Sequence, residues 1–303
     1  MVLKRLSAEH VVYTMDRRHS PAISVSSKDT LVVETIEGWN ILQKIKKLGT
    51  TGEQVDVRAL VDLNQINPAT GPIYVIGAEP GDAISVKILD IKVSDVGLVI
   101  LDPEFGVLKD EIPTSYAAIQ TIGRRKINFL GKIRIPVRPS IGTIGVAPRE
   151  GEVSCLYPGD HGGNLDTTDV TVGSELHLPV FVKGALLALG DGKAAMGDGE
   201  VSGTSVDCDL EVKIRVNVLK SEELRRPRIL TRNHIMTLAS AKTMEEALRL
   251  SMRDMVELIS KRREMTKAEA YMLTSLVGDA IVSQVVNPLV TVRMRVPRSI
   301  CRF

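Results

Sequence analysis

The chain has 303 residues, of which 44% are hydrophobic and 25% are charged, a composition that is ordinary for a soluble globular enzyme. This length can bury one large core or two modest ones. With 39 basic and 37 acidic residues the formal net charge is only +2, so no strong field attracts nucleic acid or an anionic membrane. The aromatic content of 3% also argues against a stacking surface for single-stranded nucleic acid.

The cysteine and hydropathy patterns indicate a cytoplasmic protein. Cys155, Cys208 and Cys301 are too few and too irregularly spaced for a disulfide framework or a cysteine-based zinc site. The N-terminus lacks the apolar run of a signal peptide, and no stretch of about twenty apolar residues exists that would span a membrane. We therefore expect a reducing compartment and no membrane association.

Short runs of Val and Ile bounded by Gly, Pro, Asp and Ser predict that most of the chain is β-structure. In chain order, residues 28–34, 81–88 and 173–178 each begin with a tight polar turn and continue with alternating residues. Such alternation places one face of a strand in a core and the other in water. The pattern predicts a mainly β fold, a β-sandwich or jelly-roll-like intertwined β domain.

Helical signals concentrate near the C-terminus. Thr243 precedes Glu246 and Thr266 precedes Glu269 at the spacing of a capping box, in which each side chain satisfies a free backbone N–H group. Apolar residues follow each box at helical spacing. We predict a helical hairpin over about residues 243–278, packed on a single domain that covers residues 1–303, since no Pro- or Ser-rich linker marks a boundary.

Two glycine-rich polar segments in the middle of the chain are the strongest functional signal. Residues 158–166 read Pro-Gly-Asp-His-Gly-Gly-Asn-Leu-Asp, and residues 189–200 contain four glycines, two aspartates, a lysine and a glutamate. Glycine allows the backbone to approach closely or to adopt positive φ, so side chains on such segments can converge on one small object. This composition is typical of a metal or hydrolytic site.

Metal-assisted hydrolysis needs a few ligands, an open coordination position and a proton acceptor. A set of carboxylates with one histidine fits zinc or calcium. The alternative for Asp160 is a turn, because Asp in Pro-Gly-Asp caps its own backbone. Asn164 either orients a substrate amide or caps a turn. The candidate ligands and bases are His161, Asp160, Asp166, Asp191, Asp198 and Glu200.

On these residues the chain resembles the acetamidase/formamidase family. The match is carried by residues 158–166, 190–204 and 71–82, and residues 142–148 and 279–287 add to it, in the same order along nearly the whole chain. The resemblance implies a β-rich, cytoplasmic, oligomeric amidohydrolase that cleaves formamide, acetamide or a related short amide to acid and ammonia. It also implies a divalent metal, zinc or calcium, in some members.

One departure from the family pattern matters. Where members often have His and Gln, this chain has Lys193 and Met196. An ammonium group is a poor metal ligand and, unless buried, a poor base at neutral pH. The departure leaves two alternatives to linear amide hydrolysis: a non-catalytic oligomer that binds a metal or small ligand, and a hydrolase of cyclic amides such as lactams.

Our hypothesis from the sequence is metal-assisted hydrolysis of a short linear amide, with zinc favoured over calcium and with Glu200 as general base. Lys193 or Asn164 would stabilise the developing oxyanion or hold the amide. Because exposed β edges are commonly covered by pairing, we expect a homodimer. The predicted catalytic residues are Glu200, Asp191 and Lys193, the predicted substrate-binding residues are Asn164 and Asp166, and the predicted metal ligands are His161, Asp191 and Asp198.

Overall fold

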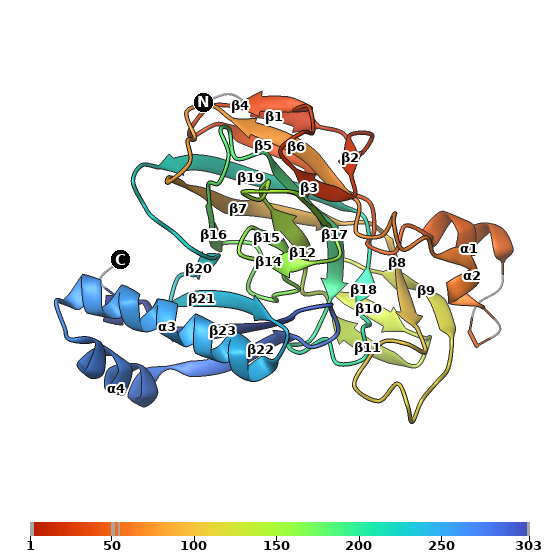
Figure 1. Ribbon diagram of the computed structural model, residues 1–303. Coiled ribbons are helices and arrows are strands. Elements are labelled where there is room, and N and C mark those ends of the chain that lie inside the picture. The colour runs from red at the N-terminus through yellow and green to blue at the C-terminus, as the bar shows by residue number, and fades with distance from the viewer. Residues whose placement is uncertain (1–2, 50–51, 54, 302–303) are drawn as a thin grey trace.

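The computed structural model describes residues 3–49, 52–53 and 55–301, so both ends of the predicted domain lie outside the described residues. Most regular structure in the described part is β, in two large sheets, and the longest helices lie near the C-terminus (Figure 1). The prediction of a mainly β fold is confirmed. None of the helices in the described ranges is long and apolar enough to cross a membrane.

The first large sheet contains the three strands that follow a polar turn in the sequence pattern, β5, β7 and β16. Its order, with bounds, is β1 (Leu3–Leu6), β5 (Thr30–Glu34), β19 (Leu210–Leu219), β7 (Ala83–Val93), β16 (Glu175–Pro179), β20 (Arg228–Leu230), β21 (His234–Ala241), β23 (Val290–Pro297) and β22 (Asp279–Gln284).

The second large sheet carries most of the residues that form the site. Its main order is β11 (Ile133–Pro136), β10 (Lys126–Phe129), β9 (Tyr116–Ile122), β8 (Val96–Leu101), β18 (Val206–Asp207), β17 (Leu187–Ala195), β12 (Ser140–Gly145), β15 (Gly162–Asn164) and β14 (Pro158–Gly159). Beside β17 lie β6 (Ala69–Val75), β2 (Val11–Val12) and β4 (Ile23–Val25), and a separate pair consists of β13 (Glu152–Ser154) and β3 (Thr14–Asp16). With nine and twelve strands in the described residues, the sheets are larger than those of an eight-stranded jelly roll.

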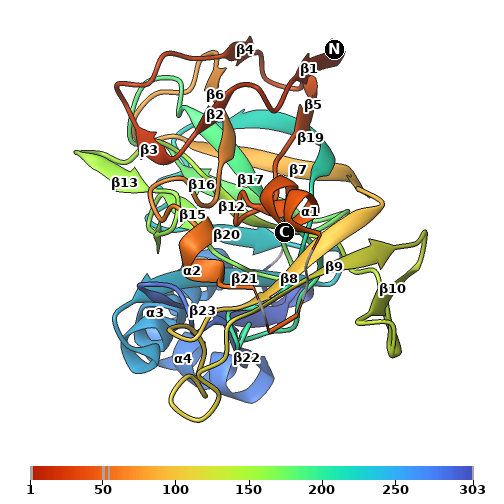
Figure 2. The ribbon, with the colours of Figure 1, turned by 90° about the vertical axis from the view of Figure 1, so that its right-hand side faces the viewer.

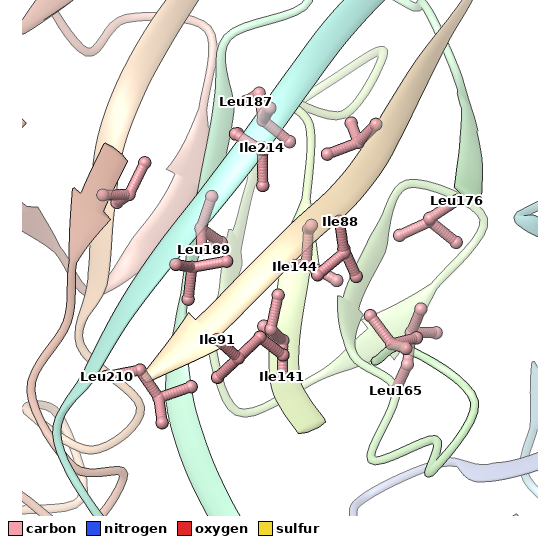
Figure 3. Close-up of a cluster of buried hydrophobic side chains, with 14 of the residues drawn as sticks. Ile88, Ile91, Ile141, Ile144, Leu165, Leu176, Leu187, Leu189, Leu210 and Ile214 are labelled. Atoms are coloured by element: carbon pink, nitrogen blue, oxygen red, sulfur yellow. The ribbon is translucent and has the colours of Figure 1, made fainter. Parts of the chain in front are cut away.

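The two sheets pack face to face and enclose the main hydrophobic core. Ile88 on β7 and Ile214 on β19 lie on one side, and Ile144 on β12 and Leu189 on β17 lie on the other (Figure 3). Strand β19 buries every second residue, as expected for a strand with one wet face. Strand β17, in contrast, is buried at eight of its nine positions, so any polar side chain that it carries is buried too.

The predicted helical hairpin is confirmed as α3 (Met244–Arg263) and α4 (Lys267–Val277), followed by the short 3₁₀ helix η1 (Arg298–Cys301). Met255 and Ile259 of α3 pack with Ile235 of β21 and Met294 of β23, so the hairpin covers one end of the first sheet (Figure 1). Both predicted capping threonines accept a backbone N–H, and the box that opens α4 is complete.

Two short helices, α1 (Leu42–Leu48) and α2 (Val57–Leu60), escaped the sequence analysis. They lie against β8 and β9, on the side of the molecule that faces the viewer in Figure 2. The buried Glu37 side chain lies before α1 and caps its N-terminus. It accepts hydrogen bonds from the backbone N–H groups of Trp39, Ile41 and Leu42 at 2.6–2.8 Å. Burial raises the pKa of Glu37 to about 7, although these three donors favour the ionised form.

We predict that Glu37→Ala destabilises the protein by about 2 kcal/mol or more, since three buried N–H groups lose their acceptor at once. The measurement is urea unfolding followed by circular dichroism. The matched control is Thr266→Ala, which removes an exposed cap of α4 and should cost only about 1 kcal/mol. Equal losses for the two variants would contradict the role assigned to Glu37.

Candidate functional site

The centre of β17 carries the sequence Gly190-Asp191-Gly192-Lys193, in which the side chains of Asp191 and Lys193 share one face. A side chain at Gly190 would overlap the Pro68 carbonyl oxygen, and one at Gly192 would overlap the Cys208 carbonyl oxygen. Glycine is therefore required because neighbouring backbone presses against the opposite face of the strand. This close packing holds the two polar residues at fixed positions.

Lys193 lies at the centre of four carboxylates. Its Nζ atom is 2.9 Å from Asp191 Oδ1 and 3.0 Å from Asp207 Oδ1, and Asp207 is its direct neighbour across the β17–β18 pair. Glu200 Oε1 lies at 3.4 Å and Asp166 Oδ1 at 3.5 Å. The lysine side chain is 7% exposed and each carboxylate 4% or less. These charges interact with little screening by water.

Four buried carboxylates exceed the charge of one ammonium, so some of them keep a proton. Burial, opposed by Lys193 and reinforced by the other carboxylates, raises the pKa of Asp191 to about 8. Burial and the neighbouring carboxylates likewise raise the pKa of Glu200 well above its usual value. Burial alone would lower the pKa of Lys193, but the surrounding carboxylates raise it well above its usual value. These directions favour the charged form of Lys193 and the protonated forms of Asp191 and Glu200.

This group of charges borders a small cavity of about 40 Å³. A single water needs roughly 10–15 Å³ by this measure, so the space corresponds to about three waters. Trp39 and Phe105 form an aromatic wall, with ring centres 6.1 Å apart and ring planes at 88°. The lining residues are Trp39, Ile66, Asn67, Phe105, Leu156, Asn164, Asp166, Asp191, Lys193, Glu200, Gly203, Val286 and Asn287.

The first glycine-rich segment reaches the same cavity through Asn164 and Asp166, at and just after the end of β15. The Asn164 side chain accepts a hydrogen bond from Thr143 Oγ1 at 3.0 Å and donates one to the Leu156 carbonyl at 3.3 Å. Asp166 Oδ2 accepts a 2.7 Å hydrogen bond from Asn287 Nδ2. Asp166 Oδ1 accepts no hydrogen bond.

Four non-glycine residues that line the cavity have backbone in the left-handed region. Their φ angles are 50° at Asn67, 39° at Asp166, 56° at Asp191 and 42° at Glu200. Such backbone is uncommon outside glycine and costs free energy that the surrounding structure must supply. Its concentration around one cavity supports the interpretation of that cavity as a functional site.

His161 is not among the residues that line this cavity. The imidazole is buried, its Nε2 atom has no hydrogen-bond partner, and burial lowers its pKa to about 4. A side chain at Gly159 or Gly163 would press against the ring, so the glycines of this turn make room for a neutral histidine. The expectation that His161 shares a pocket with Glu200 is not met, because packing in the β14–β15 turn directs the ring elsewhere.

Asp198 also lies outside the cavity. Its Oδ1 atom accepts hydrogen bonds from Arg293 Nη2 and Thr168 Oγ1, both at 2.7 Å, and its side chain is 45% exposed. Arg293 is almost fully buried and also pairs with Asp169. Asp198 therefore neutralises a buried guanidinium.

The structure thus separates the three predicted metal ligands, His161, Asp191 and Asp198. No group of three or more His, Cys, Asp or Glu side chains in the described ranges is arranged to hold a metal ion. The carboxylates that do converge surround an ammonium group, and no histidine lies with them. The residues present do not fit the predicted zinc, which favours nitrogen and sulfur ligands.

Two residues of the site were missed in the sequence. Asp207 follows a buried valine on β18, and its Oδ1 atom also accepts a hydrogen bond from Ser205 Oγ. Asn287 lies in the loop between β22 and β23, where buried Gln284 accepts the backbone N–H groups of Val286 and Asn287. A buried strand that carries a carboxylate was the available signal for Asp207. Residues 279–287 contribute to the family resemblance and include Asn287, but no pattern in the sequence predicted a role for this residue.

A formamidase from Methylophilus methylotrophus is 29% identical over an alignment of 218 residues, with 52% of this chain and 52% of that protein covered. An acetamidase from Mycolicibacterium smegmatis is 29% identical over an alignment of 219 residues, with 52% of this chain and 54% of that protein covered. The chain spans about half the length of the curated relatives that it matches.

Solved structures match over almost the whole chain. A recombinant predicted acetamidase/formamidase from Thermoanaerobacter tengcongensis has a TM-score of 0.93 and 40% identity, with 99% of this chain and 97% of that chain covered. An acetamidase from Bacillus halodurans has a TM-score of 0.91 and 38% identity, with 97% of each covered. A gamma lactamase from Delftia acidovorans, at 20% identity and a TM-score of 0.64 over 97% of this chain and 90% of that one, shares the fold.

The family model described as "Acetamidase/Formamidase family" matches residues 4–154 and 149–303, which together include every residue that borders the cavity. The match, the fold and the two converging glycine-rich segments agree with one another. The chain therefore belongs to the acetamidase/formamidase family.

Proposed function

We propose that the protein hydrolyses a short linear amide to a carboxylate and ammonia in the cavity beside Lys193. The observation that carries this proposal is a buried ammonium among four carboxylates, at the edge of a cavity with room for about three waters. A space of this size suits the smallest amides. Relatives that bear the names formamidase and acetamidase support the same substrate class.

Lys193 would stabilise the oxyanion. Amide hydrolysis places negative charge on the former carbonyl oxygen when water attacks, and a fixed positive charge in a dry site lowers the energy of that state. Lys193 stays charged because carboxylates surround it, and β17 holds its stem rigidly. It needs no reorganisation when the charge appears.

Proton transfer would divide between Asp166 and Glu200. Asp166 Oδ1 accepts no hydrogen bond, so it is free to take a proton from the attacking water. Glu200 holds a proton and would give it to the leaving nitrogen, so that ammonia departs as a neutral molecule. Both oxygens lie within 3.5 Å of Lys193 Nζ, which offers a route for returning the proton from Asp166 to Glu200. This assignment makes Glu200 the acid, whereas the sequence hypothesis made it the base.

We predict that Lys193→Met, Asp166→Asn and Glu200→Gln each lower kcat/KM by about 10²- to 10⁴-fold, because each removes a charge or a proton carrier at the reacting atoms. The measurement is ammonia release from formamide and acetamide by folded protein. Saturable amide binding by the parent protein without ammonia release would instead support the non-catalytic alternative.

Asp198→Asn distinguishes this cavity from the ligand set predicted from the sequence. The change is as conservative as Asp166→Asn, but it falls on a half-exposed partner of Arg293 outside the cavity. We expect it to keep activity within about threefold of the parent, since the asparagine keeps an oxygen that can accept the hydrogen bonds and Arg293 keeps its ion pair with Asp169. If Asp198→Asn and His161→Ala abolish ammonia release while Glu200→Gln does not, the site is misplaced.

We predict that Ile66→Ala shifts preference toward longer amides. Ile66 is buried and borders the cavity, so truncating it makes room for additional methylene groups of an acyl chain. The ratio of kcat/KM for butyramide to that for acetamide should rise about tenfold or more. Ile76→Ala, at an exposed position, is the control and should leave the ratio unchanged.

We also propose a cytoplasmic homodimer. Support comes from β22, which lies at the edge of the first sheet in the described chain, and from α4, which exposes Tyr271, Met272 and Leu276. Edge strands and exposed apolar patches are commonly covered by a partner. Sedimentation equilibrium should give the mass of two chains, and Leu276→Glu should shift the distribution toward monomer. A monomeric parent protein would contradict the proposal.

A further inference from the structure

We propose that the Lys193 ammonium is the resident cation of this site, in place of a divalent metal, and that removing it converts the four carboxylates into a divalent-cation site. The inference concerns what the site binds and does not depend on amide hydrolysis. It begins from the position of Nζ, which lies 2.9–3.5 Å from an oxygen of each of four carboxylates.

The four oxygens come from separate segments of the chain but converge on one point. Asp191 lies on β17, Asp207 on β18, Asp166 after β15, and Glu200 beyond the end of β17. A second cation bound by these oxygens would lie within a few ångströms of the ammonium, where like charges in a buried site repel strongly. The lysine therefore excludes a metal from the position that the carboxylates create.

The surrounding backbone prevents the carboxylates from turning away. Asp191 is confined between Gly38 and Gly142, since a side chain at either glycine would overlap one of its two carboxylate oxygens. Asp191 Oδ2 and Asp166 Oδ1 are buried and accept no hydrogen bond, and both lie against Gly142. Among the described residues, Asp166 Oδ1 is paired only with the Lys193 ammonium, at 3.5 Å, so both oxygens already face the space that a cation would fill.

The donor chemistry identifies the class of cation. Every candidate ligand around Nζ is a carboxylate oxygen, which is the ligand type that Ca²⁺ prefers. His161, the nitrogen donor expected from the sequence, does not border the cavity. We therefore infer that the vacated site favours Ca²⁺ over Zn²⁺.

The experiment compares the parent protein with Lys193→Met and with the control Lys220→Met. The exposed Lys220 forms an ion pair with the largely buried Asp82 and lies outside the cavity. After dialysis against a chelator, each protein is titrated at pH 8 with calcium chloride and, separately, with zinc chloride. Isothermal titration calorimetry gives the stoichiometry, and the thermal midpoint reports stabilisation by binding.

We expect Lys193→Met to bind one equivalent of Ca²⁺ and to gain several degrees in thermal midpoint at millimolar calcium. The parent protein and Lys220→Met should show neither effect, and the parent purified without added metal should contain much less than one equivalent of any divalent metal. One equivalent of metal in the parent, with a midpoint that falls on chelation, would overturn the proposal.

A folded Lys193→Met variant that binds no Ca²⁺ would also overturn the proposal. If that variant does not fold in the absence of calcium, Lys193→Gln keeps a polar group at the position and repeats the titration. For Lys193→Gln, binding of one equivalent of Ca²⁺ would support the proposal, and folded protein that binds no Ca²⁺ would overturn it. All of these readouts measure metal binding or metal content, and none of them measures activity. If the parent protein releases no ammonia from amides but the metal titrations give the expected results, the proposed function is refuted and this inference still holds.

Discussion

The burial of charge around Lys193 is the constraint on which the rest of the site depends. An isolated ammonium or carboxylate in a protein interior is very costly, and removing one partner of a buried pair typically costs about 3–5 kcal/mol. Lys193 can therefore be buried only if its carboxylate partners arrive with it. Two come from adjacent strands, Asp191 and Asp207, and two from loops, Asp166 and Glu200. The charge group consequently ties four segments of the chain together.

The β-sandwich makes this arrangement possible because β17 is covered on both faces. Glycines at 190 and 192 let neighbouring backbone approach, and the side chains of Asp191 and Lys193 meet, with Lys193 Nζ 2.9 Å from Asp191 Oδ1. Two peripheral elements complete the cavity. The α1 region contributes Trp39, held by Glu37, and the β22–β23 loop contributes Asn287. Each is held in place by buried side chains that accept backbone N–H groups.

In our proposal, Lys193 and protonated carboxylates balance the charge in this site, whereas the sequence suggested a metal site. The two solutions serve the same chemical need, a fixed positive charge near the reacting carbonyl. The fold is compatible with several chemistries, because function resides in the site that a fold carries. The solved gamma lactamase structure, which shares the fold at 20% identity, illustrates that the architecture does not by itself specify the substrate.

Local sequence patterns were enough to predict the mainly β fold, the helical hairpin near residues 243–278 and two polar segments of the site. Strand alternation, capping boxes and glycine-rich turns are patterns of this kind. The two segments supply Asn164, Asp166, Asp191, Lys193 and Glu200. Tertiary structure alone decided which polar side chains meet. It buried His161 in a glycine-rich turn and placed Asp198 on Arg293, and it brought Asp207 and Asn287 to Lys193 and Asp166. Tertiary structure also positioned Glu37 to accept the backbone N–H groups at the beginning of α1, although Glu37 is not part of a capping box. These outcomes depend on strand register and on contacts between residues far apart in the chain, and neither leaves a periodic signal in the sequence.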